Sequence, residues 1–132
     1  MLRYLLDTNV VIRRLTEPKK LSREQTRILD DLERNGQPFA VSAITLLEIA
    51  VLLGDRSGRI KGDVGQILDA LDHPLCRIVP LAFEVAAEVA AIGGTLRDPA
   101  DRTIVATARV HRLKLLTSDE RTIDSGLVAV ID

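Results

Sequence analysis

The sequence is poor in aromatic residues, cysteine and histidine, and each shortage excludes a kind of site. Aromatic residues make up 2% of the 132 residues, with no tryptophan, which argues against recognition of nucleic-acid bases or sugars by stacking on aromatic side chains. One cysteine, Cys76, cannot form an internal disulfide, and with two histidines it cannot supply a Cys/His zinc cluster. We therefore interpret Cys76 as a small core residue.

The chain also carries almost no net charge and has no long apolar run. A formal net charge of −1 predicts no strong field over the whole molecule, so any contact with nucleic acid must come from a local basic patch. The longest apolar stretch, residues 40–53, contains Ser42, Thr45 and Glu48 and is too short to span a bilayer. No signal peptide is recognisable. We expect a cytoplasmic protein of one domain, residues 1–132, without a membrane segment.

Short apolar runs alternate with longer helical patterns along the chain. The predicted strands are five runs, mostly continuous in apolar residues, at 2–6, 38–42, 76–81, 114–118 and 127–131. The predicted helices lie between them, at 21–36, 42–54, 63–73, 83–94 and 98–113. Residues 56–63 are predicted to form an internal loop. This pattern predicts an α/β fold with a mainly parallel central sheet flanked by helices on both faces.

Two predicted strands end on an acidic residue. The run 2–6 continues directly into Asp7, and the run 114–118 continues into Asp119. In open α/β sheets, binding sites form at the carboxyl ends of the strands. Each acid could equally cap the helix that follows it, because aspartate is a preferred N-cap residue.

Three further acids have both a structural and a functional interpretation. Glu48 is the one charged residue of a helix that is apolar nearly all round, and we expect that helix to be buried on most faces. Its carboxylate would then face either a narrow strip of solvent or a polar site. Asp98 before Pro99 is typical of an N-cap followed by proline at the first helical position, and Asp101 then stands beside the positive end of the helix.

The acids placed at a strand end, at a helix start or alone on an apolar helix are Asp7, Glu48, Asp101 and Asp119. Four carboxylates gathered at one edge of a sheet would repel one another and have raised pKa values unless a cation neutralised them. Oxygen ligands without histidine or cysteine select Mg²⁺ or Mn²⁺. Such ions commonly stabilise charge on a phosphoryl oxygen.

Four segments, taken in order, resemble the PIN-domain ribonucleases, and most of all the VapC-like toxins of bacterial and archaeal toxin–antitoxin pairs. The segments are LLDTNVV (5–11), SAITLLEIA (42–50), DPADRTIVATA (98–108) and LLTSDE (115–120). The resemblance covers essentially the whole chain. It implies a Mg²⁺- or Mn²⁺-dependent endoribonuclease that hydrolyses RNA with a metal-activated water and leaves 5′-phosphate and 3′-hydroxyl ends.

The resemblance also assigns residues and partners. It implies that the metal is held by Asp7, Glu48 and Asp101, and that Asp119 completes the site or holds a second ion or water. Asp98 is a further candidate ligand, although we assign it to capping. The positions at which the family has small polar residues that hold the carboxylates or the water are Thr8, Asn9 and Ser118. The implied partners are an RNA substrate, a small antitoxin whose C-terminal segment occupies the site, and a second copy in a homodimer.

Cations near an acidic pocket are required for RNA binding, because the phosphate backbone dominates affinity. Arg97 and Arg102 flank the DPAD acids, and we predict that they contact phosphate. A solvated surface or an ion pair explains them equally well. Arg13 and Arg14 follow the first motif and are further basic residues of this kind.

Three other classes of protein share part of this pattern. A haloacid-dehalogenase-like phosphatase also opens with an apolar strand ending in D-x-D, but here Asn9 replaces the second acid and the chain is short. A response-regulator receiver domain has an aspartate after its middle strand, which the run 76–81 lacks. A non-catalytic binding module, whose acids only cap helices, predicts that replacing Asp101 by asparagine hardly changes stability.

Overall fold

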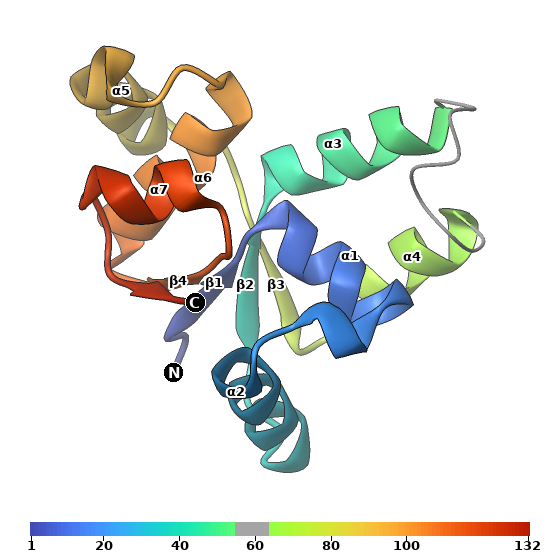
Figure 1. The fold of residues 1–132 in the computed structure, drawn as a ribbon. Coiled ribbons are helices and arrows are strands. Elements are labelled where there is room, and N and C mark those ends of the chain that lie inside the picture. Colours follow the sequence, from blue (N-terminus) through green and yellow to red (C-terminus); the bar gives the residue numbers. More distant parts are fainter. Residues whose placement is uncertain (55–63) are drawn as a thin grey trace.

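In the computed structural model, which describes residues 1–54 and 64–132, five parallel strands form one sheet in the order β3-β2-β1-β4-β5 (Figure 1). The strands are β1 (Tyr4–Leu6), β2 (Phe39–Ser42), β3 (Cys76–Val79), β4 (Lys114–Leu116) and β5 (Val130–Ile131). Every pairing in this sheet is parallel. Each strand lies within one of the predicted apolar runs, so the predicted fold class is confirmed.

The helices of the described residues are α1 (Thr8–Thr16), α2 (Arg23–Arg34), α3 (Ala43–Gly54), α4 (Val64–Leu71), α5 (Phe83–Ile92), α6 (Pro99–His111) and α7 (Glu120–Ser125). Two short 3₁₀ turns, η1 (Pro18–Lys20) and η2 (Gly93–Thr95), connect them. Five helices coincide with predicted ones. Helices α1 and α7 lie outside the predicted helix ranges, although the sequence allows Asp7 and Asp119 each to cap a following helix. The one buried residue of α7, Thr122, gives no apolar stripe. The predicted loop 56–63 lies outside the described residues.

Local capping explains where two of these helices begin. The Ser22 Oγ accepts a hydrogen bond from the Gln25 amide (3.0 Å), and the Gln25 Oε1 accepts one from the Ser22 amide (3.2 Å), which completes a capping box for α2. The Asp98 Oδ1 accepts from the amides of Ala100 (2.8 Å) and Asp101 (3.0 Å) at the start of α6. The predicted cap at Asp98 is therefore confirmed.

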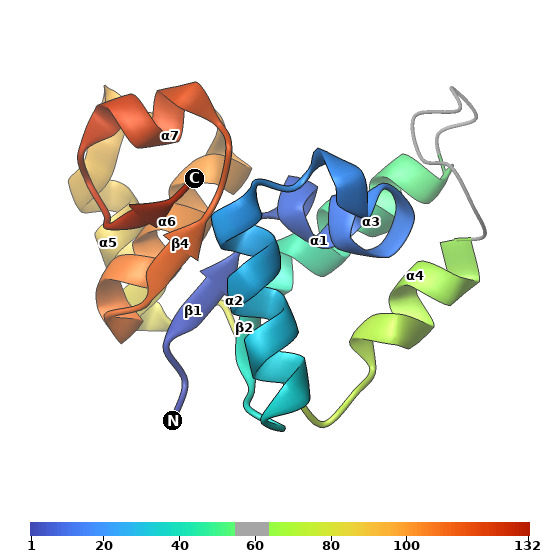
Figure 2. The same ribbon diagram turned by 60° about the horizontal axis from the view of Figure 1, so that its bottom comes forward.

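Both faces of the sheet are covered, as Figures 1 and 2 show, with α1, α2 and α4 on one side and α5 and α6 on the other. Alternation along β1 divides the core accordingly: Leu6 packs with the α1 and α2 side, and Leu5 packs with the α5 and α6 side. Cys76 is buried in the first of these clusters, which confirms it as a core residue. The continuous apolar runs follow from this double burial.

Helix α3 is more exposed than its apolar sequence predicts. Leu47 and Val51 expose 58% and 63% of their surface, so the expectation that this helix is buried on most faces is wrong. The side with Ile49 packs in the core, whereas the side with Leu47 faces outward. The apolar composition of α3 therefore marks an exposed surface as well as a core contact. Within the described residues, no helix combines the length and the apolar character needed to cross a bilayer.

The strand order creates a crevice at the centre of the sheet. The chain leaves β1 toward β2 on one side, and β4 lies on the other side of β1, so the connections diverge at the carboxyl ends of β1 and β4. Such a switch point is where open α/β sheets bind ligands. Asp7 directly follows β1, and Thr117 directly follows β4. The first and last acidic motifs therefore meet at this edge.

Candidate active site

Asp7 is held at the sheet edge by three hydrogen bonds. Its amide donates to the Leu116 carbonyl (3.0 Å), which fixes the backbone against β4. Its Oδ1 accepts from the Thr8 amide (2.8 Å) and caps α1, while its Oδ2 accepts from the Thr117 hydroxyl (2.7 Å). The residue is 8% exposed. Burial raises the pKa of Asp7, although these hydrogen bonds act in the opposite direction.

The Thr117 hydroxyl links the first and last acidic motifs. It donates to Asp7 and accepts from the Asp119 amide (3.1 Å), and the residue is fully buried. The Asp119 Oδ2 in turn accepts from the hydroxyl of Thr122 (2.9 Å) on α7. The negative charge of Asp119 contributes to the raised pKa of Asp7, so the two carboxylates share one electrostatic environment.

Glu48 belongs to the same site rather than to a strip of solvent. The Thr8 hydroxyl donates to the Glu48 Oε1 (2.5 Å), and the Thr45 hydroxyl lies 2.9 Å from that of Thr8. Because the single hydroxyl proton of Thr8 points to Glu48, Thr45 must donate to Thr8. Partial burial raises the pKa of Glu48, and the carboxylate of Asp7 raises it further. The hydroxyls of Thr45 and Thr8 thus hold the carboxylate of Glu48 in a position where the charge of Asp7 acts on it.

Asp101 feels the charge of every other candidate acid. Burial is the largest cause that raises its pKa, to about 6, and the repulsive carboxylates add to the effect in the order Asp98, Asp7, Asp119 and Glu48. Asp101 stands in the first turn of α6, where its amide is capped by Asp98. Helix α6 thus adds a fourth segment of the chain to those that carry Asp7, Glu48 and Asp119.

In the described residues, the carboxylates interact electrostatically, but they do not form a complete set of metal ligands. Within residues 1–54 and 64–132, no three acidic, histidine or cysteine side chains are arranged to enclose a metal ion. The available donors are carboxylate and hydroxyl oxygens, which suit Mg²⁺ or Mn²⁺ and not zinc. Mutual repulsion of the kind that raises the pKa of Asp101 is the charge pattern that a divalent cation would relieve.

A polar cavity of about 450 Å³ opens beside the acids. Its walls are Asn9, Arg13, Ser118, Asp119, Glu120 and Arg121. Ser118 accepts a hydrogen bond from the Gln25 side chain (3.3 Å), which ties α2 to this edge. Two of the three predicted supporting residues, Asn9 and Ser118, therefore line the cavity, and the third, Thr8, holds Glu48.

The two arginines predicted to contact phosphate, Arg97 and Arg102, do not line the polar cavity. The Arg102 guanidinium donates to the carbonyl of Leu96, and to that of Arg97 at 3.5 Å, so it braces the segment before α6. The side chain of Arg97 is exposed. The structure gives Arg102 a backbone-bracing role, and phosphate binding by Arg97 and Arg102 stays a prediction.

Sequence reasoning missed the supporting hydroxyls and one of the two arginines of the polar cavity. The missed residues are Thr45, Thr117, Thr122 and Arg121, whereas the sequence identifies Arg13 only as a basic residue that follows the first motif. A signal existed for Thr117, because it lies in the segment LLTSDE (115–120) that also contains Asp119. The threonine on α3 lies three residues before Glu48, on the same helix face.

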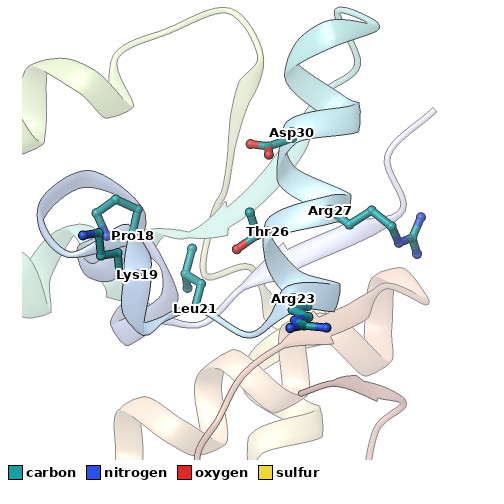
Figure 3. A pocket seen from close by; sticks show the side chains of 7 residues that line it. All are labelled: Pro18, Lys19, Leu21, Arg23, Thr26, Arg27 and Asp30. Atoms are coloured by element: carbon teal, nitrogen blue, oxygen red, sulfur yellow. The ribbon is translucent and has the colours of Figure 1, made fainter.

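A second cavity, of about 560 Å³, lies against α2 (Figure 3). Its lining residues are Pro18, Lys19, Leu21, Arg23, Thr26, Arg27 and Asp30. In Figure 3, Thr26 and Asp30 are on the side of α2 that faces η1, whereas Arg27 points away from it. None of the four candidate acids lines this cavity. It is therefore separate from the acidic site.

Comparison with known proteins gives consistent matches over the whole chain. Residues 4–125 match the model of the PIN domain family. The ribonuclease VapC22 of Mycobacterium tuberculosis is 32% identical over 122 residues, which cover 92% of this chain and 90% of that protein. The fold is similar to that of VapBC2 from Rickettsia felis, with a TM-score of 0.75, 18% identity and coverage of 99% and 98% of the two chains. It is also similar to a toxin–antitoxin complex from Klebsiella pneumoniae, with a TM-score of 0.68, 24% identity and coverage of 98% and 96%.

Proposed function

The chain belongs to the PIN-domain family, and from this membership we propose that it is an endoribonuclease that acts as the toxin of a toxin–antitoxin pair. The relative that is 32% identical is a ribonuclease, and the aligned region spans nearly all of both chains. Hydrolysis of RNA phosphodiester bonds is the proposed reaction. A haloacid-dehalogenase-like phosphatase and a receiver domain belong to other families, so we set both interpretations aside.

One observation carries this proposal: hydrogen bonds through Thr117 and Thr8 hold Asp7, Asp119 and Glu48 at one edge of the sheet. The charges of these acids and of Asp98 add to the burial that raises the pKa of Asp101 to about 6, as expected for carboxylates that lie near one another. The acids come from four separate segments of the sequence, namely Asp7, Glu48, Asp101 and Asp119. Their convergence at the switch point of the sheet supports an active site there.

The donor set fits a divalent cation, and we propose Mg²⁺ or Mn²⁺. The residues that would hold it are Asp7, Glu48, Asp101 and Asp119, with Asp98 as a further candidate. When bound, the ion supplies charge neutralisation and Lewis acidity for phosphodiester hydrolysis, the expected products being 5′-phosphate and 3′-hydroxyl ends.

Threonine hydroxyls hold these carboxylates in place. Thr117 occupies one oxygen of Asp7, and Thr8 occupies one oxygen of Glu48. These bonds to neutral donors orient the side chains without cancelling their charge, so the site keeps its attraction for cations. The fully buried positions of Thr45 and Thr117 exclude water from the rear of the site.

A protein partner is supported by the apolar surface beside α3. A cavity of about 570 Å³ lies between α3, α4 and β3, and its walls include Leu46, Leu47, Leu68 and Ile78. Exposed apolar surface of this kind marks interaction sites. We propose that a small antitoxin and a second copy of this chain are the partners, and that the protein acts on RNA in the cytoplasm.

The test is RNA cleavage by the purified protein without its partner. A panel of transfer RNA and ribosomal stem-loops is incubated with Mg²⁺, Mn²⁺ or EDTA, and the variant Asp7→Asn is prepared identically as the control for contaminating nucleases. Asparagine is itself a good N-cap, so this variant removes the charge and keeps the start of α1. Asp30→Asn, at an exposed position on α2 outside the site, is the matched control for loss of one acid.

We expect discrete cuts with either metal ion, in wild type and Asp30→Asn, and none with EDTA or with Asp7→Asn. Equal cleavage by wild type and Asp7→Asn would contradict the proposal. Covalent labelling by a small phosphodonor would also contradict it, because an aspartyl-phosphate belongs to the phosphatase and receiver chemistries and not to hydrolysis by water.

A further inference from the structure

The polar cavity beside the acids has two guanidinium groups in its wall. Arg13 comes from α1 and Arg121 from α7, and both face a space that also touches Asp119. The positive charge of Arg13 lowers the pKa of Asp7, so this side chain acts directly on the candidate active site. We propose, on the basis of the ribonuclease function proposed above, that Arg13 and Arg121 bind a backbone phosphate of the RNA next to the one that is cleaved.

Among the described residues, neither of these two arginines is held by a carboxylate partner, in contrast to Arg14 and Arg109. Arg14 pairs with Asp30 and Glu33, and Arg109 pairs with Glu88. In the part of the chain that the structure describes, neither Arg13 nor Arg121 forms a salt bridge. Their guanidinium groups therefore keep the donor fork that binds a phosphate through two parallel hydrogen bonds.

The position of the cavity fits a phosphate adjacent to the reacting one. Asp119 forms part of both the candidate acidic site and the cavity wall, so the cavity lies directly beside a strand bound at the acids. Asn9 and Ser118, the neutral residues of the wall, are small and polar, and no aromatic side chain lines it. Without a surface on which a base could stack, the cavity binds the backbone and not the base.

Two acids of the wall, Asp119 and Glu120, oppose a bound anion, and of these Glu120 lies outside the proposed metal site. Glu120 is exposed and stands in the first turn of α7, next to both Asp119 and Arg121 in sequence. Its charge repels phosphate and lowers affinity. The proposal therefore requires opposite effects from neighbouring residues: loss of either arginine weakens RNA binding, and Glu120→Gln strengthens it.

The test measures RNA binding apart from cleavage. Short single-stranded RNAs of several sequences are bound to protein that carries Asp7→Asn, which does not cleave, over a range of salt concentrations. The variants are Arg13→Gln, Arg121→Gln, their combination and Glu120→Gln. Arg34→Gln, at the exposed C-terminal end of α2 and paired with Asp31, is the matched control. Thermal unfolding of each variant checks that the fold is retained.

Each arginine variant is expected to weaken binding about tenfold for all RNA sequences alike, and to reduce the slope of log K against log salt by about 0.7, the value for one phosphate contact on a single strand. Arg34→Gln leaves affinity and slope at the wild-type values. Unchanged affinity and slope in the double variant, with wild type still cleaving RNA, would overturn this inference alone. If wild type neither binds nor cleaves RNA, the proposed function fails and this inference fails with it.

Discussion

Replacing Asp101 by asparagine should stabilise the metal-free protein while abolishing cleavage. The carboxylate of Asp101 is destabilised in the folded protein by burial and by the charges of Asp98, Asp7, Asp119 and Glu48. Asparagine has nearly the same shape and carries no charge, so it removes the repulsion and keeps the packing. Most point substitutions lower the free energy of unfolding, and we would expect the same of Asp101→Asn if Asp101 only stabilised its helix.

The magnitude follows from the pKa of about 6, compared with an ordinary value of 3.8. The two pKa values differ by about 2, and each unit of pKa corresponds to about 1.4 kcal/mol. Removing the charge should therefore raise the free energy of unfolding by at most about 3 kcal/mol above pH 6. Because Asp101 is partly exposed, solvent screening reduces this gain to about 1–2 kcal/mol. Asparagine also loses the favourable charge at the start of α6, which costs about 0.5 kcal/mol. We expect a net stabilisation of about 1 kcal/mol, or about 3 °C in Tm.

The pH dependence of the free energy of unfolding tests whether the charge of Asp101 destabilises the folded protein. Between pH 3.8 and about 6 the folded protein binds more protons at Asp101 than the unfolded chain does. The free energy of unfolding of the wild type therefore falls as pH rises through this range, and the penalty is complete above about pH 6. Burial and neighbouring charge also raise the pKa values of Asp7 and Glu48, which adds to the fall. In Asp101→Asn this fall should be smaller.

Urea denaturation at pH 4 and pH 8, in EDTA, measures both effects. Glu84→Gln is the matched control, because Glu84 stands in the first turn of α5 at an exposed position. It should lose a few tenths of a kcal/mol, as expected when a charge near a helix start is removed. A clear destabilisation of Asp101→Asn at pH 8, equal to or larger than that of Glu84→Gln, would refute the reasoning and return Asp101 to a purely helix-stabilising role.

Two further substitutions test the support of the site and its apolar surface. Thr117→Val leaves the Asp7 Oδ2 and the Asp119 amide without this hydroxyl, so we expect a loss of about 1–3 kcal/mol in urea denaturation and weaker cleavage. Thr107→Val, whose buried hydroxyl only bonds to its own helix, should show the smaller loss, and equal losses would contradict a special role for Thr117. Leu47→Glu, at a 58% exposed position, should keep stability within about 0.5 kcal/mol and reduce the mass measured by light scattering from dimer to monomer. An unchanged mass would place any dimer contact elsewhere.

The sheet could be predicted from the sequence because strands that are buried on both faces appear as continuous runs of apolar residues. Strands whose two faces are covered, such as β1 with Leu5 and Leu6, need apolar residues at every position. Helix α3 has the same composition for a different reason, since Leu47 and Val51 face outward. Apolar content alone does not distinguish a core contact from an exposed interaction surface.

Which of the basic residues face the acids could not be predicted, because neighbours in sequence diverge in space on a helix. Arg102 directly follows Asp101, but successive helical residues point about 100° apart, and its guanidinium turns back to the Leu96 carbonyl. Arg13 stands six residues after Asp7 and still acts on that carboxylate. Which arginine faces the acids depends on how α1 and α7 pack at the edge of the sheet, and one sequence does not contain that packing.

Capping and site membership, which sequence reasoning treated as alternatives for Asp7, coexist because a carboxylate has two oxygens. Oδ1 caps α1 through the Thr8 amide, and Oδ2 accepts from the Thr117 hydroxyl, directly after the neighbouring strand β4. Both bonds hold the side chain at the carboxyl end of β1, so a preferred N-cap residue at a strand end also stands where a site forms. The helix preference that makes aspartate common at such positions is therefore also what makes it available as a ligand, and its N-cap signature does not argue against function.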